Sequence, residues 1–418
     1  MSATAESAGA LVVHARRARA WGLIGQERKL RSMLNLNDFQ PAVRGMLPRA
    51  AYGYVANGSE DGVTLQGNCE AFKDWRLVTR VLTDVEHRSQ ATTLFGRTYA
   101  SPFGIAPMGA SAVVAYDADN VMARAAAKAR IPFILSANSI IPMEEVAQQY
   151  PGAWFAAYQS PTSKAIEGMV DRVAQAGFST FVLTADVPVG SNRENDHRAG
   201  YSMPLWPTPR LSWDAATHPR WLVGTAARTW FRRGLPRIEN LEPEGGPNLF
   251  SRAVASIASH SSLSWDHVRL IRRLWKGPFV VKGILSPQDA RIARECGVDG
   301  IVVSNHGGRQ LDEAVSPLQV LPGIMAEKGG MTIMIDSGFR RGTDVLKALA
   351  LGADFVFIGR PFLFAAILAG EAGVSHAIDL LTKEIDTDIA LLGLHDVGEA
   401  SGEMLLEVDG AARGVKPD

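Results

Sequence analysis

Short runs of apolar residues alternate with amphipathic segments through the middle of the chain. The runs are rich in Val, Ile and Phe, and a turn containing Gly, Pro or polar residues follows each of them. Near-continuous apolar strands that alternate with helices are typical of a parallel sheet covered by helices. The predicted strands are Phe103–Pro107, Phe133–Ser136, Trp154–Tyr158, Thr180–Ala185, Phe279–Gly283, Ile301–Ser304, Thr332–Asp336 and Phe355–Gly359.

Eight such strand–helix units favour a closed (β/α)8 TIM barrel, with an open doubly wound sheet as the alternative. The spacing between strands is regular except after the fourth, where residues from about 190 to 263 form a long insertion. The predicted helices are Asp119–Arg130, Ser163–Ala176, Ser264–Trp275, Pro287–Cys296 and Thr343–Ala350.

The rest of the chain divides around this barrel. We expect an N-terminal arm over residues 1–34, a single barrel domain over residues 35–400 and a loose C-terminal tail over residues 401–418. Residues 35–100 of the domain form an N-terminal helical cap, with one helix around Leu47–Ala56.

Composition narrows the class of protein. The 418 residues carry 43 basic and 43 acidic side chains, a balance that argues against nucleic-acid binding. Two cysteines, Cys69 and Cys296, are too few for a disulfide framework or a structural zinc site, so a reducing cytoplasm is expected. No stretch of the sequence approaches the 18 or so consecutive apolar residues that a membrane-spanning helix needs. The apolar run Ala10–Val13 precedes its arginines, the reverse of a secretory signal, which leaves a solvated arm or a transit peptide.

Polar residues and glycines follow nearly every predicted strand, at the end of a barrel where active sites form. The loops after the last two strands are Asp336–Gly342 (DSGFRRG) and Gly359–Pro361 (GRP). Turns at these two positions are a recurrent phosphate site, and Arg340 and Arg360 add fork-shaped donors. A cofactor or substrate that carries a phosphate group is therefore expected.

A lysine stands at the end of the fifth strand, in the run Val280–Gly283. An amine that emerges from an apolar strand is costly unless it meets an anion or has a function. Lys282 could form a Schiff base, as aldolases of this fold do, or place a positive charge beside an electron-accepting ring that becomes anionic on reduction. A lysine that forms only a salt bridge is the third interpretation.

The densest set of chemical groups is Ser304–Asp312 (SNHGGRQLD), directly after the sixth strand. His306 is a candidate base that titrates near neutral pH, and Arg309 could hold a carboxylate in a two-pronged contact. Asp186, after the fourth strand, could orient His306 and stabilise its protonated form, and Arg193 follows near the same mouth. A single loop histidine is more often structural, but the glycines and the arginine beside this one favour catalysis.

These motifs resemble the FMN-dependent (S)-2-hydroxy acid oxidases and dehydrogenases, which include glycolate oxidase, lactate oxidase, lactate dehydrogenase and mandelate dehydrogenase. The resemblance runs from about Leu36 to about Gly393, and Ser304–Asp312 matches the family's signature almost letter for letter. It implies FMN as the cofactor, His306 as the base and Asp186 as its partner. Substrate contacts are implied for Tyr54, Tyr158, Arg193 and Arg309. Cofactor contacts are implied for Pro107, Met108, Gly109, Ser136, Thr184, Lys282, Ser304, Asp336, Ser337, Gly338, Arg340, Gly359 and Arg360.

Three positions bear on the choice of substrate and acceptor. Asn138 stands where glycolate oxidase carries a bulky tryptophan, so the resemblance implies a larger pocket that favours aryl or longer 2-hydroxy acids. Ala156 replaces a glutamine found in most members, which bears on the flavin potential. Gly109 matches the mandelate dehydrogenase type, where several oxidases carry alanine.

The insertion contains a cationic, tryptophan-rich segment. Residues 205–237 carry six arginines and one acid, with Trp206, Trp213, Trp221 and Trp230 interleaved. Such a segment can lie in an anionic membrane interface, and it resembles the membrane-associated mandelate and lactate dehydrogenases. A lid over the active site or a subunit contact is the alternative.

The sequence therefore predicts FMN-dependent oxidation of a mandelate- or lactate-like (S)-2-hydroxy acid to the 2-oxo acid, with a quinone or protein as electron acceptor. The alternatives are oxygen as acceptor, a Schiff-base aldolase built on Lys282 and a non-catalytic phosphate-binding barrel. No metal site is expected. The resemblance also implies a homotetramer, and the location is expected to be cytoplasmic or peripheral on the inner face of the membrane.

Overall fold

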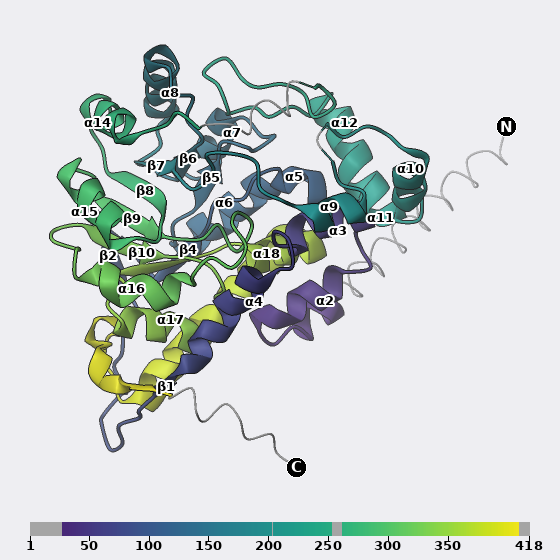
Figure 1. The fold of residues 1–418 in the computed structure, drawn as a ribbon. Helices are drawn as coiled ribbons and strands as arrows, with labels where there is room; N and C mark the ends of the chain where they lie inside the picture. The colour runs from purple at the N-terminus through teal and green to yellow at the C-terminus, as the bar shows by residue number, and fades with distance from the viewer. Residues whose placement is uncertain (1–26, 203, 253–260, 409–418) are drawn as a thin grey trace.

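The computed structural model describes residues 27–202, 204–252 and 261–408, and parallel strands form its centre (Figure 1). Successive strands pair in parallel, β11 pairs with β4, and a bridge between Ile105 and Phe133 joins β4 to β5. This ring confirms the predicted barrel, and all eight predicted strands are present with ends that differ by one or two residues. The strands are β4 (Phe103–Ile105), β5 (Ile134–Ser136), β6 (Trp154–Ala157), β7 (Thr180–Thr184), β8 (Phe279–Ile284), β9 (Gly300–Val303), β10 (Thr332–Ile335) and β11 (Phe355–Ile358).

One barrel helix follows each strand and covers the outside of the ring. In α8 the buried residues Ile166, Met169, Val170 and Val173 recur at helical spacing, and the helix ends at Gly177 in the left-handed conformation. The five predicted barrel helices are confirmed. The helices are α6 (Ala118–Ala129), α7 (Met143–Gln149), α8 (Ser163–Ala176), α14 (Trp265–Leu274), α15 (Pro287–Glu295), α16 (Pro317–Met325), α17 (Gly342–Ala350) and α18 (Arg360–Leu392).

Bulky side chains fill the barrel interior at the N-terminal ends of the strands. Trp154 and Phe355, the first residues of β6 and β11, belong to one buried cluster, and Phe357 extends this cluster toward the middle of the barrel. A hairpin of β2 (Thr92–Leu94) and β3 (Arg97–Tyr99) adds Leu94 and Tyr99 to the cluster, and the Trp154 indole donates a hydrogen bond to the Tyr99 hydroxyl at 3.3 Å. The open space of the barrel is therefore confined to the other end.

The N-terminal cap is fastened to the loop that follows β9. The Asp312 carboxylate accepts hydrogen bonds from the backbone N–H groups of Gly62, Val63 and Thr64 at 2.9, 3.1 and 2.8 Å, and so caps the start of α4. The side-chain amides of Asn68 and Asn305 hydrogen-bond to each other. The cap elements are η1 (Leu36–Asp38), α2 (Phe39–Val43), α3 (Arg49–Ala56), α4 (Val63–Glu70), η2 (Ala71–Asp74) and β1 (Trp75–Leu77).

The insertion between β7 and α14 contains short helices, of which α10, α11 and α12 lie together at one edge of the molecule (Figure 1). We call residues 205–237 the platform. Parts of the predicted insertion, residues 203 and 253–260, lie outside the described residues, as does the predicted arm up to residue 26. The elements are α9 (Glu194–Ala199), α10 (Pro209–Ala216), α11 (Pro219–Trp221), the π-helical η3 (Leu222–Ala227) and α12 (Arg228–Arg233).

The start of the predicted loose tail is ordered, which corrects that expectation. After η4 (Val397–Glu399) and η5 (Gly402–Met404), β12 (Leu405–Glu407) pairs antiparallel with β1 of the cap. A three-residue strand is too short to show alternation, and its partner lies far away in the sequence. Residues 409–418 of the predicted tail lie outside the described residues.

Among the described residues, α18 alone is long and apolar enough to cross a membrane by length and composition, which the sequence had not led us to expect. Ala369 and Gly370 have non-helical backbone angles, so α18 consists of two helical pieces. Of its most apolar window, 61% is buried inside the protein, and α18 packs against α6 and α2. This helix therefore serves as a core helix of the barrel.

Candidate active site

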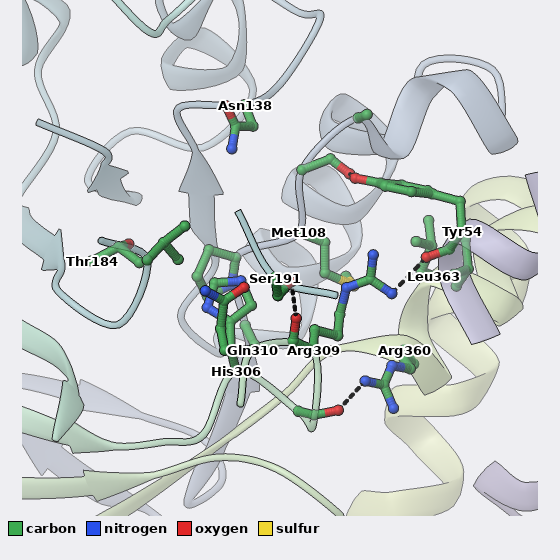
Figure 2. Close-up of a pocket in the computed structure, with 18 of the residues that line it drawn as sticks. Tyr54, Met108, Asn138, Thr184, Ser191, His306, Arg309, Gln310, Arg360 and Leu363 are labelled. Carbon is green, nitrogen blue, oxygen red and sulfur yellow. Dashed lines mark hydrogen bonds between the residues drawn. The ribbon is translucent and has the colours of Figure 1, made fainter. Parts of the chain in front are cut away.

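A cavity of about 580 Å³ lies at the C-terminal ends of the barrel strands (Figure 2). It is lined by every predicted site residue except Asp186, Ser136 and Ser304. These three lie behind the wall: Asp186 and Ser304 hydrogen-bond to residues that line it, and the Ser136 hydroxyl accepts from the backbone N–H of Asn138 at 3.2 Å. The topology therefore brings the predicted residues to one place.

His306 and Asp186 form a hydrogen-bonded pair at the edge of the cavity. His306 Nδ1 lies 3.0 Å from Asp186 Oδ1, and His306 Nε2 lies 3.4 Å from the Tyr158 hydroxyl. Burial lowers the pKa of His306, and Asp186 only partly offsets this. Burial acts to raise the pKa of Asp186, but the charges of His306 and Lys282 outweigh it, so this pKa is lowered. Near neutral pH a neutral imidazole thus faces an ionised carboxylate, which leaves Nε2 as a base.

A glycine makes room for this pair. Gly283 at the end of β8 has a φ of +105°, and a Cβ atom built on it would lie 2.5 Å from the Asp186 Cβ. Any other residue would have to adopt a strained backbone and displace Asp186.

Two arginines approach the same cavity. Arg193 donates to the Ser191 hydroxyl at 2.9 Å and to Gln310 Oε1 at 3.0 Å. Arg309 donates to the backbone carbonyl of Tyr54 at 2.7 Å (Figure 2), and its guanidinium lies 3.7 Å from the Asp196 carboxylate. Burial and the charge of Arg309 lower the pKa of Arg193. Two guanidinium groups beside one buried acid form a site suited to a carboxylate ligand.

Lys282 lies deep in the cavity floor, with a side chain that is 5% exposed. Its Nζ donates to the Ser304 hydroxyl at 2.7 Å and lies 3.2 Å from Asp336 Oδ2. Burial acts to lower the pKa of Lys282, but Asp336 and Asp186 outweigh it and raise the pKa. A Schiff-base nucleophile must be a neutral amine, so this environment opposes the aldolase alternative. It suits a fixed positive charge beside a ring that gains electrons.

The far end of the cavity carries Arg340 and Arg360. Arg360 donates to the backbone carbonyl of Gly307 (Figure 2). Its burial, together with the charges of Arg309 and Arg340, lowers the pKa of its guanidinium to about 9. Among the described residues, the guanidinium groups of Arg340 and Arg360 form no salt bridge with an acidic side chain. Helix α18 also begins here, so the site calls for an anion such as a phosphate.

The remaining wall is shaped by the cap and the insertion. The Tyr54 hydroxyl donates to the carbonyl of Gly109 at 2.9 Å, and its ring stacks on Tyr201 with centroids 4.6 Å apart. Apolar side chains of the insertion complete this side. They are Ile238, Leu241 and Leu249.

The sequence did not reveal several of these residues. Tyr201, Ser191 and Asp196 line the cavity from the insertion, where no periodic pattern or strand end marked them. Gln310 lies within the signature stretch and bridges two predicted residues, because its amide also donates to the backbone carbonyl of Asp186 at 3.0 Å. Its place beside Arg309 was the only signal for it.

The model of the FMN-dependent dehydrogenase family matches residues 43–407. The chain belongs to this family. It is 36% identical to (S)-mandelate dehydrogenase of Pseudomonas putida over 90% of this chain and 94% of that protein. It is 39% identical to L-lactate dehydrogenase of Xanthomonas campestris pv. campestris over 89% of this chain and 96% of that protein.

Solved structures agree with this assignment. The crystal structure of the monotopic membrane protein (S)-mandelate dehydrogenase matches with a TM-score of 0.84 and 35% identity, over 90% of this chain and all of that chain. A mandelate oxidase structure matches with a TM-score of 0.74 and 31% identity, over 90% of this chain and 98% of that chain. The barrel is therefore that of an FMN-dependent oxidoreductase.

FMN is the cofactor of this family, and the donor set of the cavity fits it. The buried Arg360, which lacks an acidic partner among the described residues, and Arg340 are placed to bind the phosphate. Lys282 and Thr184 line the same cavity as these arginines and His306, and they could contact the ring. The positively charged Lys282 meets the requirement of a ring that becomes anionic on reduction.

Proposed function

We propose that this flavoenzyme oxidises an (S)-2-hydroxy acid of mandelate or lactate type to the 2-oxo acid. The observation that carries the proposal is one cavity in which His306, held by Asp186 at 3.0 Å, lies with two arginines and a buried lysine. The similarity to a mandelate dehydrogenase and to a lactate dehydrogenase supports the same class of substrate.

Each side chain has a distinct task in this reaction. Arg193 and Arg309 bind the carboxylate and so fix the α-carbon, and Tyr54 and Tyr158 border the substrate oxygens. His306 takes a proton from the substrate at Nε2, and Asp186 stabilises the imidazolium that results. FMN, when bound, accepts the two electrons that leave the α-carbon. Asn138 and Gly109 border the substituent of the substrate, and the residues proposed for the cofactor would hold FMN in the same cavity.

The surface of the platform supports our proposal for the acceptor and the location. Its exposed side chains include Trp213 at 74% and Phe231 at 84% exposure, and exposed arginines lie between them. A surface of this kind suits an anionic membrane interface. The monotopic (S)-mandelate dehydrogenase supports a peripheral membrane position, which we place on the cytoplasmic face. A quinone or a membrane protein is then the acceptor, and a homotetramer is the expected assembly.

The test is an anaerobic visible spectrum of the purified holoenzyme before and after addition of (S)-mandelate or (S)-lactate, followed by air. Bleaching by either acid is the expected result, with slow recovery in air. Fast recovery of the flavin absorbance would identify oxygen, rather than a quinone or a protein, as the electron acceptor. The similarity to a mandelate oxidase favours this alternative. Flavin that neither acid reduces would contradict the proposed substrate.

A further inference from the structure

We propose that Asp119, a residue outside the cavity, sets the shape of the substrate pocket by holding the loop that carries Asn138. The inference rests on the proposed function, because Asn138 borders the bound acid in that reaction. Asp119 is a positioning residue: it acts through Ser139 and touches neither the substrate nor the cofactor.

Asp119 is a buried carboxyl group with no cation opposite it among the described residues. It lies in the first turn of α6, is 1% exposed, and accepts a hydrogen bond from the Ser139 hydroxyl at 2.9 Å. Ser139 is fully buried, and its hydroxyl also accepts from the backbone N–H of Ile141 at 3.0 Å. Burial raises the pKa of Asp119 to about 7, and the charge of Asp117 adds to this rise. Such a costly group is expected where its hydrogen bonds have a use.

The loop of Ser139 is directly coupled to the loop after β4. The backbone N–H of Ala110 donates to the carbonyl of Asn138 at 2.9 Å. A Cβ atom on Gly109 would lie 2.9 Å from the Asn138 Cβ, so the two loops are closely packed against each other at this point. The Ser111 hydroxyl, directly after Ala110, donates to the carbonyl of Met108 at 2.9 Å and contributes to lowering the pKa of Asp119.

The insertion holds the same loop from its other side. The backbone N–H of Glu239 donates to the carbonyl of Ser139 at 3.0 Å. The Asn240 side chain accepts from the Met143 N–H at 2.8 Å and donates to the Ile141 carbonyl at 2.7 Å. Asn138 is thus held between the insertion and α6, and the Asp119–Ser139 hydrogen bond is the side-chain tie to α6. Loss of this tie should let Asn138 move away from a bound ring.

The test measures ligand binding apart from turnover, on the FMN-loaded full chain. Dissociation constants of phenylglyoxylate and pyruvate are obtained from the change that each causes in the flavin spectrum. Asp119→Ala and Ser139→Ala should each weaken the preference for phenylglyoxylate over pyruvate about tenfold, the scale on which pocket shape discriminates between ligands. Asp119→Asn keeps an acceptor for Ser139 and should preserve the preference. In the background of Asn138→Ala, Asp119→Ala should no longer change the ratio.

The outcomes separate this inference from the proposed function. An unchanged preference in both alanine variants, or an equal change with and without Asn138→Ala, would overturn the role of Asp119. A uniform loss of affinity for both oxo acids would show a merely structural role and overturn it too. If Asp119→Ala does not fold, Ser139→Ala carries the test. The proposed function is tested separately by reduction of the wild-type flavin with the hydroxy acids.

Discussion

The barrel mouth and the platform break the usual rules of burial in opposite directions. At the mouth, charged groups are buried: Lys282 and Asp336 are 5% and 9% exposed, and each has partners. On the platform, Trp213, Val223 and Phe231 are 74%, 67% and 84% exposed. Buried charges mark a site for a ligand, whereas clustered exposed apolar groups mark a site for another surface. The proposed function assigns these two kinds of binding to two regions of one chain.

The platform is not loosely attached, although it exposes apolar groups. The Trp221 indole donates to the carbonyl of Val113 at 2.9 Å, and the Arg228 guanidinium lies 3.8 Å from the centre of the Tyr116 ring. Arg233 bridges Asp117 and Glu145. Its inner face is therefore bound to the barrel, and its outer face carries the exposed apolar groups of the proposed membrane contact.

The largest expected effect is at the mouth. His306→Gln should lower turnover by about 10²- to 10⁴-fold, because the base is lost while the residues around FMN are unchanged. The measurement is the steady-state rate with an artificial acceptor, together with the FMN content. His218→Gln on the platform is the control, with turnover near that of the wild type. Near-normal activity in His306→Gln would remove this residue from the proposed mechanism.

The pH dependence of kcat/KM should show the titration of His306. Only neutral His306 accepts a proton, so kcat/KM should fall about tenfold per pH unit below its pKa. Burial places that pKa below the usual value of about 6.5. Asp186 raises the pKa, so Asp186→Asn should move the acid limb to still lower pH and reduce the rate. An acid limb that moves to higher pH in Asp186→Asn would contradict the pairing of Asp186 with His306.

Changes on the platform should leave the mouth unaffected. The double variant Trp230→Ser with Phe231→Ser should reduce binding to anionic phosphatidylglycerol vesicles by about tenfold or more, because two exposed apolar groups are lost. Turnover with a soluble artificial acceptor should stay unchanged. Leu391→Ser, which removes an exposed apolar group elsewhere, is the control. Equal vesicle binding by all three proteins would favour a lid or a subunit contact.

The smallest expected effect concerns the attachment of the platform. Arg228→Ala removes the contact with Tyr116 and should lower the free energy of unfolding by about 0.5–1 kcal/mol. Denaturant unfolding of the holoenzyme measures this. Arg220→Ala, at another exposed position of the platform, should leave the unfolding midpoint unchanged. A larger loss of stability in Arg220→Ala than in Arg228→Ala would contradict the stabilising role of the Arg228–Tyr116 contact.

The same contrast explains what the sequence could predict. Barrel strands are buried on both faces and read as apolar runs, and the topology then gathers their ends, so His306, Asp186 and Lys282 could be grouped from the sequence alone. Tyr201 could not be placed, because the path of an insertion depends on tertiary contacts. The pairing of β12 with β1 was invisible for the same reason.

The signature stretch also combines two roles that its letters do not separate. His306 and Arg309 line the cavity, whereas Asp312 caps α4 and Asn305 binds Asn68. The resemblance identified the whole stretch, but only the hydrogen bonds show which residues hold the N-terminal cap in place.

The filled interior at the N-terminal ends of the barrel strands has a consequence for the kinetics. Because Trp154 and Phe355 fill the N-terminal end, the proposed hydroxy acid and its acceptor would both approach from the C-terminal end of the barrel. If the proposed reaction is right, we expect the 2-oxo acid to leave before the acceptor arrives, so that the two half-reactions alternate. Initial rates with both partners varied should give parallel double-reciprocal lines, the pattern of a ping-pong cycle.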